Sequence, residues 1–118
     1  MRASQGEKKI YAILTANNVP FIEEYEFPDL ISTSGRRLRF DFAVFTRDGS
    51  LAYLIEFQGK QHYQPIGYFK GDRGLQRQRY NDSLKRAYCL KKGVKIVYIP
   101  YWDIDNITYD YIKKAAGC

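Results

Sequence analysis

Apolar positions near the start of the chain recur at the spacing of an α-helix. The apolar face consists of Ile10, Ile13 and Leu14. Ser4 is followed by Glu7 at the spacing of a capping box, which indicates a helix start at Ser4. The segment "TANNVP" interrupts the pattern before Pro20. We therefore expect a helix from Ser4 to Asn17.

The next stretches have the patterns of β-strands. The segment "FIEEYEFPDL" predicts a short strand that ends at Pro28. "GRRLRFDFAVF" alternates from about Leu38 onward, "RDG" at 47–49 predicts a hairpin turn, and "LAYLIEFQG" predicts the returning strand. That returning strand is too apolar for an edge, so we expect it in the centre of the sheet.

The second half of the chain predicts one long loop, one helix and one strand. Residues 61–75 are rich in Gly, Tyr and charge and predict the loop, which in a small domain usually has a function. "LQRQRYNDSLKRAYCLKKG" predicts a helix that ends at Gly93. Its expected inner side consists of Tyr80, Leu84, Ala87 and Tyr88. "VKIVYIPYW" predicts a strand, and the polar tail predicts a weak helix.

This order of elements predicts an α/β fold with a mixed β-sheet flanked by helices. The 118 residues are enough for one domain with a real core but not for two, so we expect residues 1–118 to form a single domain.

Carboxylates occur inside this otherwise apolar sheet. Phe40 and Phe42 are expected on one face of their strand, with Asp41 on the other. Antiparallel pairing across the turn would bring Asp41 and Glu56 to the same end and the same side. Glu7 lies on the same side of the first helix as its apolar face, so we expect it close to Asp41 and Glu56.

Carboxylates that lie close together repel each other unless a divalent cation neutralises them. Hard oxygen ligands of this kind suit Mg²⁺. We therefore expect Mg²⁺ to be the cofactor, with Asp41 and Glu56 as its protein ligands.

The formal charge of +6 favours a polyanionic partner, here double-stranded DNA. The basic residues flank the expected metal site and would contact phosphates without reading sequence. The side chains expected to contact DNA are Arg36, Arg37, Arg39, Lys60, Arg73, Arg77 and Arg79. The alternative interpretation of each cluster is a solvated basic face.

Cysteine and histidine are scarce. Cys89, Cys118 and His62 cannot supply a disulfide framework or a structural zinc site. This usage indicates a reducing cytosol. No apolar run approaches the roughly 20 residues of a membrane span, so we expect no membrane partner.

The order and spacing of these residues resemble the PD-(D/E)XK nuclease core. An acidic residue on the first helix, an Asp on the next strand and "IEFQG" on its partner carry the resemblance, with Gln58 at the usual lysine position. The finer similarity is to very short patch repair endonucleases and the related phage homing endonucleases. Their pattern corresponds here to Glu7, Asp41, His62 and Asp82, within roughly residues 4–107.

The resemblance implies a restriction-endonuclease-like core and a Mg²⁺-dependent DNA endonuclease. His62 would activate a water molecule, and Asp82 would orient its imidazole. Glu7 would hold the water shell of the ion, and Gln58 would donate to a phosphate oxygen. Gln58 lacks the positive charge of lysine, for which Lys60 or Lys85 would compensate.

The zinc site of the repair enzymes has no counterpart here, which favours a homing endonuclease catalytic domain in a bacterial or phage-infected cell. Because the first helix begins almost at once, we expect a catalytic domain excised from a longer protein with separate DNA-binding regions. Three alternatives remain open: a Holliday-junction resolvase, a restriction endonuclease, and a catalytically inactive basic DNA-binding module.

Overall fold

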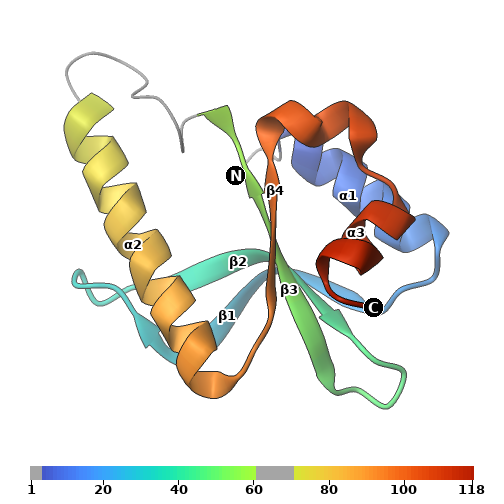
Figure 1. Cartoon of the computed structure of the whole chain (residues 1–118). Helices are drawn as coiled ribbons and strands as arrows, with labels where there is room; N and C mark the ends of the chain where they lie inside the picture. The colour runs from blue at the N-terminus through green and yellow to red at the C-terminus, as the bar shows by residue number, and fades with distance from the viewer. Residues whose placement is uncertain (1–3, 61–70) are drawn as a thin grey trace.

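The protein is a four-stranded mixed β-sheet between two helical layers (Figure 1). The computed structural model describes residues 4–60 and 71–118, without the side chains of residues 71–73 and 75. The elements in chain order are α1 (Gln5–Ala16), β1 (Phe21–Ile31), β2 (Arg37–Phe45), β3 (Leu51–Gln58), α2 (Gly71–Lys92), β4 (Ile96–Pro100), the 3₁₀-helix η2 (Tyr101–Asn106) and α3 (Tyr109–Ala115). The predicted α/β class is confirmed.

The strands lie in the order β1-β2-β3-β4. The first three pair antiparallel, whereas β3 and β4 pair parallel. The predicted hairpin turn is present, with Gly49 at a φ of 90° that favours glycine. Strand β3 lies between β2 and β4, as its continuous apolar run predicted.

Each face of the sheet has its own core. Helices α1 and α3 cover one face through Ile10, Leu14 and Ile112, which pack against the sheet residues Phe42 and Ile55. Helix α2 covers the other face through Tyr88 and Cys89, which join the cluster of Phe40, Leu30 and Leu54. The sheet is therefore apolar on both faces, so a polar side chain within it has to find a partner.

Two predicted element boundaries were wrong. Strand β1 continues past Pro28 to Ile31. Proline is tolerated there because β1 is an edge strand whose register shifts between Glu26 and Ile31. Helix α2 begins at Gly71, so the last part of the predicted 61–75 loop is helical; residues 61–70 lie outside the described residues.

The predicted inner side of α2 was wrong in part. Tyr80 is 50% exposed and Ala87 is also exposed. The inward positions include Cys89, which is buried, and Lys85, whose ammonium forms an ion pair with Glu56 of the sheet. A hydrophobicity pattern does not place a lysine inward, because the buried acidic partner that stabilises it is remote in sequence.

Phe40 and Phe42 lie on opposite faces of the sheet, so the prediction that they share a face was wrong. Phe40 packs on the α2 side and Phe42 on the α1 side. Neighbouring β1 changes face in the same way, since Phe21 packs on the α1 side and Tyr25 on the α2 side. Between these two, Glu24 has a φ of 49°. The regular alternation of both strands is thus interrupted at one row of the sheet.

Candidate active site

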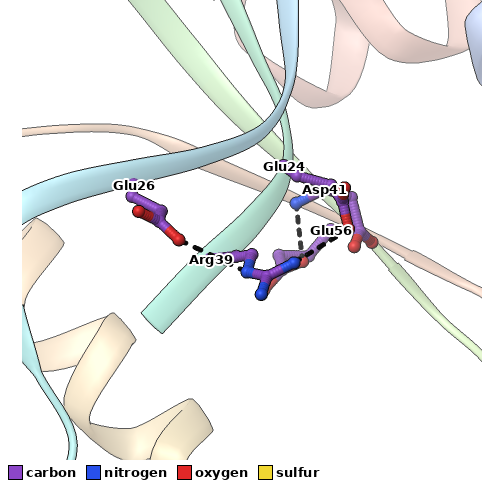
Figure 2. A network of polar contacts seen from close by, with 5 residues as sticks. All are labelled: Glu24, Glu26, Arg39, Asp41 and Glu56. Atoms are coloured by element: carbon purple, nitrogen blue, oxygen red, sulfur yellow. Dashed lines mark hydrogen bonds and ion pairs between the residues drawn. The ribbon is translucent and has the colours of Figure 1, made fainter. Parts of the chain in front are cut away.

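Asp41 and Glu56 face each other across β2 and β3 at that interrupted row. Next to them, Phe42 pairs with Ile55, so the antiparallel register places Asp41 opposite Glu56. The backbone N–H of Asp41 donates to Oε2 of Glu56 at 3.2 Å, as Figure 2 shows. The backbone N–H of Phe57 donates to Oδ2 of Asp41 at 2.7 Å. Each strand therefore uses a carboxylate of the other as a hydrogen-bond acceptor.

Lys85 of α2, which covers one face of the sheet, contacts Glu56. Its ammonium forms an ion pair with Oε1 of Glu56, and it lies 5.0 Å from the centre of the Phe40 ring. The exposed fraction is 13% for the Lys85 side chain and 11% for that of Glu56. Both oxygens of Glu56 thus have partners, which is what allows its burial.

The pKa of Asp41 is raised to about 8. Burial is the largest cause, followed by the negative charge of Glu56, while the Phe57 N–H acts in the opposite direction and Glu7 adds to the rise. A group with this pKa changes charge near neutral pH, which is frequent at functional sites. Glu7 and Glu56 thus both act on Asp41 electrostatically.

Glu7 reaches this region because the first turn of α1 lies directly against β3. Ser4 caps the helix, as predicted: its hydroxyl accepts from Glu7 N–H at 3.2 Å and donates to Glu7 Oε1 at 3.0 Å. Gly6 is buried, and a Cβ atom there would clash with the ring of Phe57. The absence of a side chain at Gly6 therefore permits the approach of Glu7.

The donors present agree in kind with a Mg²⁺ site. Burial and the negative charges of Glu56 and Glu7 raise the pKa of Asp41, and a divalent cation would oppose the repulsion between these carboxylates. Among the described residues, no group of three or more His, Cys, Asp or Glu side chains is placed to hold a metal ion. Mg²⁺ usually keeps several waters and binds through one or two carboxylates, a number that Asp41 and Glu56 would match.

The other predicted catalytic residues differ in where the structure places them. Gln58 is the last residue of β3, is half-buried and pairs in register with Pro100. Asp82 is half-buried on α2, and its charge raises the pKa of the Tyr98 phenol. His62 lies outside the described residues.

The arginines of the β1–β2 hairpin are engaged with glutamates. Arg39 forms ion pairs with Glu24 and Glu26, both at 3.3 Å, and Arg37 lies 4.0 Å from Glu26. Figure 2 shows Arg39 between its two partners. These side chains are a third to about half exposed, so the pairs are weak.

The other residues expected to contact DNA lie in the turn of that hairpin or elsewhere in the chain. Arg36 is exposed before β2, and Lys60 is exposed after β3. Arg77 and Arg79 are exposed on the first half of α2. The side chain of Arg73 lies outside the described residues.

Three neighbours of the site had no clear signal in the sequence. Gly6 is one of them. The other two are Tyr98, which pairs in register with Glu56, and Arg86, whose guanidinium lies 4.7 Å from the centre of the Tyr98 ring. Their positions depend on pairing between β3 and β4, which are separated by the whole of α2. For Lys85 the charge alone marked it as a candidate, and the structure brings it to Glu56.

Known proteins similar to this chain come from viruses. The uncharacterized protein 307L of Invertebrate iridescent virus 6 is 34% identical over 95 residues, which are 76% of this chain and 48% of that protein. The uncharacterized protein 094L of Frog virus 3 is 41% identical over 70 residues, which are 56% of this chain and 43% of that protein. The chain thus spans about half the length of these curated relatives.

No protein-family model and no solved structure matches the chain. Within the described residues, no helix combines the length and the apolar character that a membrane span requires.

Proposed function

We propose that this chain is a Mg²⁺-dependent DNA endonuclease domain with a restriction-endonuclease-like core, related to very short patch repair and phage homing endonucleases. The observation that carries the proposal is the pair of half-buried Asp41 and buried Glu56 within the sheet, which Lys85 joins. An Asp41 carboxyl with a pKa raised to about 8 beside the buried Glu56 is costly to the fold, and a metal-dependent reaction would account for it.

The residues of the chain have separate roles in this proposal. Asp41 and Glu56 would hold the ion, which would polarise a phosphate and lower the pKa of a bound water. Lys85 pairs with Glu56 and fixes the orientation of its carboxylate. Glu7 contributes negative charge that increases the affinity for a cation. His62 accepts the proton of the attacking water, with Asp82 as its carboxylate partner.

The test is cleavage of supercoiled plasmid by the wild-type chain with Mg²⁺ and with EDTA, and by Asp41→Asn and His62→Ala variants. Asp41→Asn keeps an acceptor for the Phe57 N–H and removes the charge. We expect nicking or linearisation that requires Mg²⁺ and disappears in Asp41→Asn. Loss of a general base typically lowers the rate by about 10²–10⁴-fold, and we expect this for His62→Ala. Asp110→Asn is the matched control, because Asp110 is exposed on α3.

Intact plasmid in every reaction would contradict the proposal. Cleavage that survives in Asp41→Asn would assign the chemistry to other residues. Cleavage lost in Asp41→Asn but retained in His62→Ala would keep the metal site and remove His62 from the reaction.

A catalytically inactive DNA-binding module is the second candidate. The favouring observations are Gln58 at the usual lysine position and the Lys85 ammonium already bound to Glu56. Such a module would bind DNA equally well with Mg²⁺ or EDTA and leave the plasmid intact.

A further inference from the structure

Arg86 of α2 is held over an aromatic ring beside the acidic pair. Its guanidinium carbon lies 4.7 Å from the centre of the Tyr98 ring, a cation–π contact. Tyr98 lies on β4 directly opposite Glu56 of β3. Arg86 itself is exposed. The ring therefore fixes a solvent-facing positive charge next to Glu56.

The charges around Tyr98 agree with this placement. Burial raises the pKa of the Tyr98 phenol, Arg86 lowers it, and Glu56 and Asp82 raise it further. All three charged groups thus act on one side chain at the edge strand β4.

Arg86 makes no ion pair with a carboxylate in the part of the chain that the structure describes. This distinguishes it from Lys92, the last residue of the same helix, which lies 5.7 Å from the Tyr88 ring centre but also 3.6 Å from Asp29. It also differs from Arg39, which has two glutamate partners. Stacking without a counter-ion leaves the hydrogen-bond donors of the Arg86 guanidinium available to a ligand.

Arg79 lies on the same face of α2 as Arg86. Seven residues are nearly two full turns, so the two side chains project in the same direction about 10 Å apart along the helix axis. Arg79 is exposed and likewise forms no ion pair with any side chain that the structure describes, which leaves out those of residues 71–73 and 75. Arg77, two residues earlier, projects to a different side of the helix. One face of α2 thus carries a row of two arginines.

We propose that Arg86, stacked on Tyr98, binds a phosphodiester group of the DNA strand next to the candidate active site, and that Arg79 binds a second phosphate of the same duplex. Guanidinium groups pair with phosphate oxygens through planar, bidentate hydrogen bonds, which a fixed stack favours. This inference rests on the proposed function, and it adds Arg86 and Tyr98 to the residues that position the substrate.

The test is the affinity for a short fluorescent DNA duplex, measured in EDTA over a series of salt concentrations. We compare the wild-type chain with Arg86→Ala, Tyr98→Leu and the matched control Lys92→Ala. Arg86→Ala should weaken binding about 10-fold and reduce the slope of log K against log salt by about 1. Tyr98→Leu should weaken binding with the slope retained, because the charge remains but is no longer held in place. Lys92→Ala should change neither.

Binding in EDTA separates this inference from cleavage. If wild-type chain binds the duplex and Arg86→Ala has the affinity and slope of Lys92→Ala, the inference is overturned while the nuclease proposal stands. If Arg86→Ala has the expected effect but no variant or wild-type chain cleaves plasmid, the phosphate site stands and the nuclease proposal fails. A wild-type chain that binds no DNA overturns both. Arg86→Lys adds a further check, since it should restore the salt slope but only part of the affinity.

Discussion

Asp41 and Glu56 each accept a hydrogen bond from the backbone of the strand that carries the other. Asp41 N–H donates to Glu56 at 3.2 Å, and Phe57 N–H, next to Glu56, donates to Asp41 at 2.7 Å. Side-chain oxygens thus occupy places that backbone carbonyls normally take in an antiparallel ladder. The exchange holds two carboxylates within the sheet and interrupts the alternation of β2 there.

Substitutions of Lys85 and Glu56, which form an ion pair, should have strongly non-additive effects on the free energy of unfolding. Lys85→Met leaves a buried, unpaired carboxylate and should lower the free energy of unfolding by about 3–5 kcal/mol. The double variant with Glu56→Gln should recover much of this loss. A double-mutant cycle by urea denaturation measures the coupling. The control is Lys92→Met: Lys92 and its partner Asp29 are about half exposed, so a loss of about 0–1 kcal/mol is expected. Additive effects of Lys85→Met and Glu56→Gln would contradict a coupled pair.

Stability of the metal-free protein should fall as the pH rises. The folded-state pKa of Asp41 is about 8, above the ordinary value of 3.8. Between these values the folded chain keeps a proton that the unfolded chain has lost, so its stabilising effect is complete below about pH 4 and is lost by about pH 8. Asp41→Asn should flatten this dependence. Thermal unfolding in EDTA across this interval measures it, and an equal slope in both proteins would refute the assignment to Asp41.

Mg²⁺ should stabilise the wild-type chain most at the upper end of this pH range, where Asp41 has lost its proton. Binding to the folded state alone adds about 2.7 kcal/mol at 100 times the dissociation constant. We expect the midpoint of thermal unfolding to rise with Mg²⁺ concentration in wild type and in the surface variant Asp110→Asn. It should remain constant in Asp41→Asn. A rise of the same size in Asp41→Asn would place the cation elsewhere.

Gly6→Ala should disturb both the fold and the site. The new Cβ would clash with the buried ring of Phe57, and overpacking of this kind costs about 1–3 kcal/mol. Gly74→Ala is the matched control, because Gly74 lies in α2 with nothing within 4 Å of an added Cβ. There the change should stabilise by about 0.5–1 kcal/mol through helix propensity. Chemical denaturation measures both, and equal effects would contradict the close approach of α1 to β3.

Plasmid cleavage should decline with Gly6→Ala as well. Glu7 lies in the first turn of α1, so a displacement of that turn would move Glu7 away from the site. If Gly6→Ala has normal cleavage and reduced stability, Gly6 contributes only to the packing of α1 against β3.

The sequence determined the local elements and the residues that could bear chemistry. The capping residue Ser4, the turn at Gly49 and the long apolar run of β3 are local signals, and each element they predicted is present. Asp41 and Glu56 could be paired from the sequence, since a short hairpin fixes which residues face each other.

Tertiary structure decided what the sequence pattern could not. The faces of Phe40 and Phe42 were assigned wrongly because the alternation of β2 is interrupted where Asp41 bonds to β3. The inward position of Lys85 and the stack of Arg86 on Tyr98 depend on α2 lying across β3 and β4. Such contacts join residues far apart in the chain, so no local periodicity encodes them, and their stability comes from burial and charge pairing in the folded state.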